Sequence, residues 1–309
     1  MVTGFVSWPP PPPSPQIPCV AAVVGVVCVA LAFVSVLYVP AIQKLPRNSP
    51  AGVRVRSLAT LAVALLATLL CELLSLWLCV TQNNYDSMTC VEEVLNGIDL
   101  RRALLATCSS LALTLAIYVP DICYTVMSAS VDQEQGRWTS WSSAFFPERG
   151  WIAARNYVLA PLSEELAFRA ACVRVLLECP HCSFGTWVAV SLPAALFAIA
   201  HAHHVVERLR ESSTSKHQIA VVTLFQLAYT LAFGLFAGWL YAQTRSVGAP
   251  IIAHVVCNVL QLPNFGGMLL VIRQRDIRCA LLLLAQAFSY FMTWTCCTWI
   301  LNFDALLYN

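Results

Sequence analysis

Residues 17–39 read IPCVAAVVGVVCVALAFVSVLYV, an apolar run without a charged side chain. An α-helix needs about 20 consecutive apolar residues to cross the hydrocarbon core of a bilayer, so this run is long enough to span a membrane. No basic region precedes it, and its apolar part is long for the core of a signal peptide. We therefore expect residues 17–39 to form a retained membrane anchor.

Apolar runs of this kind recur along the 309-residue chain. Hydrophobic residues make up 59% of the sequence, charged residues make up only 11%, and the mean hydropathy is +0.70. A water-soluble domain carries many more charges on its surface. The sequence therefore predicts an all-α, polytopic transmembrane bundle of about eight helices, whose remaining spans fall near residues 57–80, 103–127, 156–178, 186–206, 218–243, 248–271 and 279–302.

The N-terminal residues 1–16 differ from the rest because they contain a proline run from Pro9 to Pro13. Such a run forms neither helix nor sheet, which predicts a short disordered or polyproline tail. The net charge is +2, and the sequence contains no basic stretch with interleaved aromatic residues. Nucleic acid is therefore not expected to be a partner.

The fourteen cysteines do not indicate a disulfide scaffold. Most lie in apolar helical runs and are expected to behave as small hydrophobic residues, among them Cys71, Cys79, Cys172, Cys257 and Cys296. Cys179 and Cys182 have the CxxC spacing of thiol oxidoreductases, but no βαβ pattern surrounds them. We favour a turn between two helices for this segment.

The positions of lysine and arginine predict the orientation of the helices. The loop after the first span carries Lys44, Arg47, Arg54 and Arg56, and the positive-inside rule places such a loop in the cytosol. The N-terminus would then face the lumen. The alternation continues through eight spans, with the exception of Arg101 and Arg102.

Ionisable residues within the spans concentrate after residue 155, and the first group is the pair Glu164 and Glu165. A charged side chain at the bilayer centre costs about 2.5–3.5 kcal/mol even on lenient insertion scales, so intramembrane charges are candidates for function. Glu165 and Arg169 have the i,i+4 spacing that places them on one helical face. Glu164 points about 100° away from that face and is expected to face a cavity.

Two later spans contribute histidines. His201 lies near the predicted cytosolic end of its span, with Phe197 one turn earlier on the same face. His254 and Asn258 form a second i,i+4 pair, which aligns both side chains on one stripe of a later helix. Carboxylate, imidazole and amide groups in one membrane interior are the parts of a hydrolytic site.

Structural roles are the alternatives for these residues. A histidine in a helix is often a satisfied core residue, and Glu165 with Arg169 would also serve as a buried ion pair that locks the bundle. Glu72 is also intramembrane, and we assign it only a packing role. No HExxH, GxSxG or paired intramembrane aspartates occur in the chain, so a hydrolase built from these residues would activate water with a carboxylate.

Three motifs carry a resemblance to a known family. The order Glu164-Glu165-x-x-x-Arg169, then Phe197-x-x-x-His201, then His254-x-x-x-Asn258 resembles the type II CAAX prenyl endopeptidases, within the larger group of CPBP intramembrane proteases. The segments PLSEEL at 161–166, HAHHVVE at 201–207 and LPRN at 45–48 also look like the eukaryotic enzymes. The likeness covers nearly the whole chain and is weakest at both ends.

The resemblance implies a multi-pass enzyme of the endoplasmic reticulum membrane that removes the last three residues from farnesylated or geranylgeranylated CAAX proteins such as small GTPases. Residues 17–309 would form a single transmembrane protease domain with its site open to the cytosol. Glu164 would be the general base and His201 its partner on the water, while His254 and Asn258 would form the oxyanion hole. Glu165, Arg169 and Phe197 would support them.

Some alternatives stay open at this point. A zinc ion held by Glu164, His201 and His254 is chemically possible, although we favour a site without a cofactor. A transporter or channel with a midplane Glu/His/Asn site is the main rival, and it predicts inverted repeats and broken helices that the sequence does not reveal. A catalytically silent membrane scaffold of the same family is the other. Helix counting also places His254 near the lumenal start of its span, away from Glu164 and His201, so a common site requires a deep cavity, a broken helix or different helix boundaries.

Overall fold

The computed structural model describes residues 19–83, 99–134, 148–177, 185–203, 205, 208–209, 215–275 and 277–303. All regular structure in these ranges is helical, which confirms the predicted all-α class. The longer helices are α1 (Cys19–Ser35), α3 (Pro50–Asn83), α5 (Leu100–Glu134), α10 (Thr186–Ala200), α12 (Lys216–Thr244), α13 (Gly248–Leu260), α14 (Phe265–Gln274) and α15 (Ile277–Leu301). The tail at 1–16 and the Cys179–Cys182 segment lie outside the described residues.

The bundle has the character of a multi-pass membrane protein. Five helical stretches are long and apolar enough to cross a bilayer, namely Cys19–Tyr38, Pro50–Leu74, Leu100–Ser128, Lys216–Thr244 and Ile277–Leu301. Large apolar side chains cover their outer faces; Phe225 is 60% exposed and Trp294 is 73% exposed. A helix is suited to this setting because it satisfies its backbone hydrogen bonds internally.

Three of the eight expected spans differ from simple membrane-crossing helices. The span expected at 186–206 is the shorter helix α10, which has 15 residues. The span expected at 248–271 is broken into α13 and α14, which are bent by 61° relative to each other. The span expected at 156–178 belongs to a helical run over 150–177 with two π-helical segments. By length and composition, the described residues thus contain five membrane spans, or six if the broken pair is one span.

The run over 150–177 contains the two glutamates. It consists of α7 (Gly150–Ala154), the π-helix η2 (Arg155–Leu159), α8 (Ala160–Glu165), the π-helix η3 (Leu166–Val173) and α9 (Arg174–Leu177). Pro161 follows η2 within this continuous run, and it contributes no N–H to the helical hydrogen bonds there. π-helical segments are rare and often lie at functional sites.

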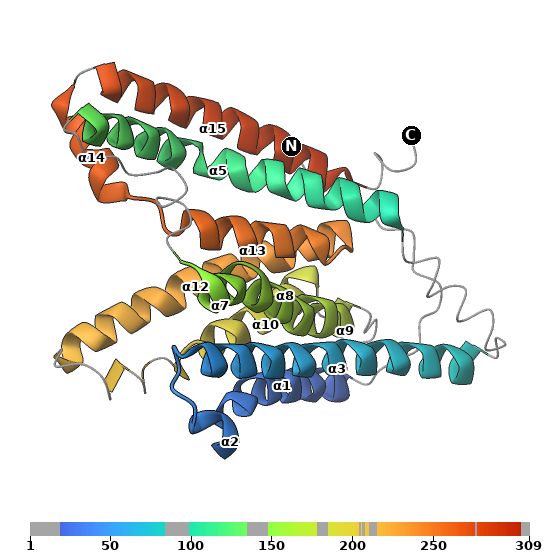
Figure 1. The fold of residues 1–309 in the computed structure, drawn as a ribbon. Coiled ribbons are helices and arrows are strands. Elements are labelled where there is room, and N and C mark those ends of the chain that lie inside the picture. Colours follow the sequence, from blue (N-terminus) through green and yellow to red (C-terminus); the bar gives the residue numbers. More distant parts are fainter. Residues whose placement is uncertain are drawn as a thin grey trace.

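The run occupies the middle of the bundle (Figure 1). On one side α5 and α15 pack along each other, and on the other side α1 packs against α3. Between these layers α8 contacts both α3 and α13. The helix that carries Glu164 and Glu165 is therefore enclosed by the helices that carry Arg56 and His254.

The break between α13 and α14 is fixed by side chains of α5. Gln261 follows α13 with a positive φ of 61°, and Pro263 lacks the N–H that a continuous helix would use. Tyr118 donates its hydroxyl to the Gln261 carbonyl at 2.8 Å, and the Asp121 carboxylate accepts from the Asn264 N–H at 2.8 Å. Two backbone groups freed by the break thus find partners on a neighbouring helix.

Helices α10 and α12 approach each other closely through small residues. A Cβ built on Gly234 would lie 3.1 Å from the Cα of Ala194, and one on Gly238 would lie 2.8 Å from Val190 Cγ1. Glycines allow such contact because they have no side chain between the two backbones. Since His201 directly follows α10 and α12 contacts the buried Arg169, this contact helps to position the site.

We predict that Gly234→Leu destabilises the protein by about 1–3 kcal/mol, the usual cost of adding volume to a packed core, because the Ala194 backbone cannot move aside as a flexible side chain could. Gly25→Leu on α1 is the matched control, since no atom of the described residues lies within 4 Å of a Cβ built there. Thermal unfolding in detergent measures both. Equal midpoints for the two variants would refute the packing argument.

Candidate active site

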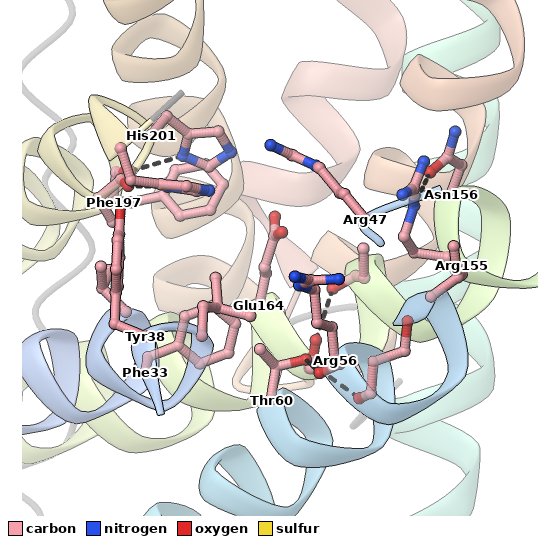
Figure 2. A pocket seen from close by; sticks show the side chains of 18 of the residues that line it. Phe33, Tyr38, Arg47, Arg56, Thr60, Arg155, Asn156, Glu164, Phe197 and His201 are labelled. Carbon is pink, nitrogen blue, oxygen red and sulfur yellow. Dashed lines mark hydrogen bonds between the residues drawn. The ribbon is translucent and has the colours of Figure 1, made fainter. Parts of the chain in front are cut away.

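A cavity of about 450 Å³ opens at the ends of α1, α3, α8 and α10. This volume falls in the range of small-molecule and peptide sites. Its charged and polar wall includes Arg47, Arg56, Arg155, Asn156, Glu164 and His201, which Figure 2 labels, together with Ser57 and His203. Its apolar wall comes mostly from α1 and η1 (Val36–Tyr38), with Phe33, Leu37 and Tyr38.

The adjacent residues Glu164 and Glu165 have different surroundings, as their helical spacing predicts. Glu164 lines the cavity, and its side chain is 17% exposed. Glu165 points into the protein, and its side chain is completely buried. One carboxylate can therefore meet a substrate or a water, whereas the other can act only on protein groups.

Glu165 forms the expected ion pair with Arg169, which is also buried. Arg169 donates from Nη1 to Glu165 Oε1 at 3.1 Å, and its Nε lies 3.1 Å from Oε2. Arg169 also donates from Nη2 to the carbonyl of Gly234 on α12 at 3.3 Å. Its guanidinium lies over the ring of Phe197, 4.6 Å from the ring centroid. The pair thus links three helices through one buried cation.

His254 lies between the two glutamates. Its Nδ1 is 2.8 Å from Glu165 Oε1, the same oxygen that accepts from Arg169. Because an ionised carboxylate only accepts, Nδ1 is the protonated nitrogen, and Nε2 points toward Glu164 Oε2 at 3.7 Å. Glu165 therefore sets the orientation and the tautomer of His254, as carboxylates do for histidines in many active sites.

The broken helix explains how His254 reaches Glu164. Because α13 begins at Gly248 and ends at Leu260, His254 lies near its middle, and α13 contacts α8 directly. The sequence left the meeting of these residues dependent on a deep site, a broken helix or different boundaries. The structure contains the broken helix.

His201 is the residue directly after α10, and it lines the cavity together with Glu164 (Figure 2). Its Nδ1 lies 2.8 Å from the carbonyl oxygen of Phe197, which can only accept, so Nδ1 donates. The Nε2 of the neutral ring is then an acceptor. Phe197 packs its ring against the imidazole at a centroid distance of 4.7 Å and fixes the plane of the ring.

An oxyanion donor is expected to line the cavity, but Asn258 is not among the lining residues. Its Nδ2 donates to the backbone carbonyl of Asn156 at 2.8 Å, so one of its two amide hydrogens joins α13 to η2. Asn156 lines the cavity, whereas Asn258 lies behind it. Asn258 and His254 lie one turn apart on α13, as predicted from their spacing. Only the second amide hydrogen of Asn258 could therefore bind a ligand.

Comparisons with known proteins agree with the three motifs. A model of the Rce1-like type II CAAX prenyl endopeptidase family matches residues 147–260, which include Glu164, His201, His254 and Asn258. CAAX prenyl protease 2 of Homo sapiens is 31% identical over 252 residues, which cover 79% of this chain and 72% of the human protein. The chain belongs to this family.

Other members of the CAAX prenyl protease 2 family match shorter parts. The Caenorhabditis elegans protein is 33% identical over 134 residues, or 41% of this chain and 47% of its own length. The Arabidopsis thaliana protein is 37% identical over 109 residues, or 35% and 34% of the two chains. No solved structure matches the chain significantly.

The geometry does not fit the zinc site considered from the sequence. Among the described residues, no group of three or more His, Cys, Asp or Glu side chains is arranged to hold a metal ion. We assign no step of the chemistry to a metal.

Sequence reasoning missed several residues of the cavity wall. Arg47, Arg56 and Arg155 were not predicted as site residues, yet all three line the cavity with Glu164. Asn156 was not singled out, although it binds Arg155, Glu148 and Asn258. The available signal was the position of Arg56, which falls, together with Arg54 and Glu72, inside a largely apolar stretch that is long enough to span the membrane.

We predict that Glu165→Gln destabilises the protein by about 3–5 kcal/mol, because it leaves the buried Arg169 without a counter-charge. Glu72→Gln is the control, since Glu72 also pairs with an arginine, Arg174, but its side chain is 33% exposed and the pair is less deeply buried. Thermal or denaturant unfolding in detergent compares the two. A smaller loss for Glu165→Gln than for Glu72→Gln would show that the buried pair does not hold the bundle together.

Proposed function

We propose that this protein is an intramembrane endopeptidase that removes the C-terminal tripeptide from farnesylated or geranylgeranylated CAAX proteins, small GTPases among them. It acts in the endoplasmic reticulum membrane and receives its substrates from the cytosolic side. Family membership supports the reaction, and the arginine-rich loops support the orientation through the positive-inside rule.

One observation carries the mechanism: the Glu164 carboxylate lines the cavity and faces His254 Nε2 at 3.7 Å. This separation is too long for a direct hydrogen bond, so both groups can bind the same water. The opposite nitrogen of His254 is fixed by Glu165. A carboxylate and an oriented imidazole around one water form a general-base site.

The proton transfers follow from this arrangement. Glu164 takes a proton from water, and the resulting hydroxide attacks the carbonyl carbon of the prenylated cysteine. His201 Nε2 accepts a hydrogen bond that helps to hold the water. Glu164 then returns its proton to the nitrogen of the leaving tripeptide as the C–N bond breaks. The products are a prenylcysteine with a free carboxylate and a tripeptide with a free amine.

The negative oxygen of the tetrahedral intermediate needs hydrogen-bond donors. His254 donates from Nε2 when its ring is protonated, and Asn258 donates through the amide hydrogen that does not bind Asn156. Because Asn258 lies behind the cavity wall, its donor becomes useful when the substrate carbonyl enters deeply between α8 and α13.

The surroundings of the cavity suit a lipidated peptide. The wall formed by α1 and η1 is apolar, and the outer faces of the neighbouring helices expose large apolar side chains. The prenyl group can thus stay in apolar surroundings while the peptide reaches Glu164. A transporter would favour broken helices in paired inverted repeats, but the described residues contain one broken pair.

We predict that Glu164→Gln abolishes cleavage of a farnesylated CAAX peptide by the purified protein in liposomes, because the amide keeps the shape of the side chain and loses the base. The unfolding midpoint should stay close to that of the wild type, since Glu164 belongs to the cavity wall and not to the buried pair. Glu72→Gln should keep its activity, because Glu72 lies outside the cavity. The assay is run with and without chelator. Retained cleavage by Glu164→Gln would show that Glu164 is not the general base.

We predict that Asn258→Ala lowers kcat by about 10²–10³-fold, the usual effect of losing one oxyanion donor, and leaves KM nearly unchanged. Steady-state kinetics with the same peptide measures both constants. A rise in KM at constant kcat would instead assign Asn258 to substrate binding. A fall in the unfolding midpoint large enough to account for the lost activity would assign it to the contact with Asn156.

A further inference from the structure

Arg56 is only half satisfied by the protein. Its Nη2 donates to the carbonyls of Ile42 at 3.3 Å and Leu45 at 3.2 Å, which tie the segment before α3 to that helix. Its Nη1 is shielded from solvent and has no hydrogen-bond partner among the described residues. A guanidinium carries five N–H donors, and a buried donor without a partner is costly.

The next residue has the same property. The Ser57 hydroxyl is buried and has no hydrogen-bond partner in the described part of the chain. Arg56 and Ser57 both line the cavity that contains Glu164. Two consecutive polar groups without a protein partner beside one cavity call for a polar partner from outside the protein, either a water or a ligand.

The charge of the wall selects the class of ligand. Arg47, Arg56 and Arg155 line the cavity, and Glu164 is the one carboxylate among the described residues that line it. Figure 2 shows the side chains of Arg47, Arg56 and Glu164 around the same space. A planar guanidinium with a spare N–H matches the two oxygens of a carboxylate. The ligand expected here is an anion.

We propose that Arg56, with Arg47 and Arg155 beside it, binds the free C-terminal carboxylate of the substrate. The inference rests on the proposed function and extends it to substrate recognition. The bond to be cut lies three residues before that carboxylate, and three extended residues span about 10 Å. Glu164 and the three arginines line one cavity of about 450 Å³, so the bond to be cut and the carboxylate can lie in the same space.

The subsite would determine which peptide bond of the substrate is cleaved. When the carboxylate is held by Arg56 and the prenyl group stays in apolar surroundings, the third peptide bond from the end lies at Glu164. A chain that continues past this point has no carboxylate at the arginines and would place an uncharged amide there. Cleavage would then be restricted to the true C-terminus.

The test compares a farnesylated CAAX peptide with its C-terminal carboxamide, which differs only in the charge at the end. We expect the wild type to cleave the acid about 10–100-fold more efficiently, the range for a hydrogen bond to a charged group. Arg56→Gln should lose this preference by losing activity on the acid and little on the amide. Arg56→Lys, which keeps the charge but lacks the planar guanidinium, should retain part of the preference for the acid.

Arg54→Gln is the matched control, because Arg54 lies on the same helix, is exposed and does not line the cavity. It should keep the wild-type preference. Arg47→Gln and Arg155→Gln test the subsite if Arg56→Gln unfolds, and each should reduce the preference. Equal cleavage of acid and amide by the wild type would overturn the proposal, as would an equal loss on both peptides in all three arginine variants.

A binding experiment separates this proposal from the proposed function. Fluorescent acid and amide peptides are titrated into Glu164→Gln and into the double variant with Arg56→Gln, in neutral lipid and in lipid with phosphatidylserine. Tighter binding of the acid that depends on Arg56 supports the subsite even if the wild type cleaves neither peptide. Equal binding of both peptides, with Arg56-dependent binding of the anionic lipid instead, would assign the arginines to a lipid phosphate and overturn the proposal.

Discussion

The buried contact of Arg169 with Glu165 is the interaction on which the rest of the structure depends. A charge deep in a membrane protein is tolerated only where a counter-charge and further acceptors surround it, and Arg169 has Glu165, the Gly234 carbonyl and the ring of Phe197. These partners come from α8, α12 and α10. The same Glu165 oxygen orients His254 on α13, so the packing of four helices and the orientation of one imidazole share a single carboxylate.

This sharing explains why two adjacent glutamates are used. A carboxylate that is completely buried against Arg169 and His254 is out of reach of a substrate. The helical rotation between neighbours places the second carboxylate, Glu164, on the cavity wall instead. The two groups then act on opposite nitrogens of His254, one by a short hydrogen bond and the other across a gap of 3.7 Å. Structural and chemical duties are thus divided between neighbours in sequence.

The parts of this arrangement that depend on local spacing could be predicted from the sequence. The pair of Glu165 with Arg169, the separate direction of Glu164 and the stripe of His254 with Asn258 all follow from the helical period. The break after α13 could not be predicted, because it is stabilised by Tyr118 and Asp121 on α5. Each of these residues lies 143 positions before its partner. Pro263 marks a possible break but not its geometry. Arg56 was read only as a loop cation, because the wall it shares with Glu164 is formed by tertiary packing.

The distribution of polarity in the cavity also constrains how a substrate can lie in it. The apolar wall from α1 and η1 and the arginine-bearing wall from the start of α3 are different surfaces of one space, with Glu164 exposed to it. A molecule with an apolar group at one end and a negative charge at the other is stabilised in one direction only, since reversal would bring the apolar group to three cations and the anion to hydrocarbon. A prenylated C-terminus has this polarity. In the proposed binding mode, the placement of charge sets the direction of the peptide, and therefore which carbonyl meets Glu164, more than the shape of the cavity does.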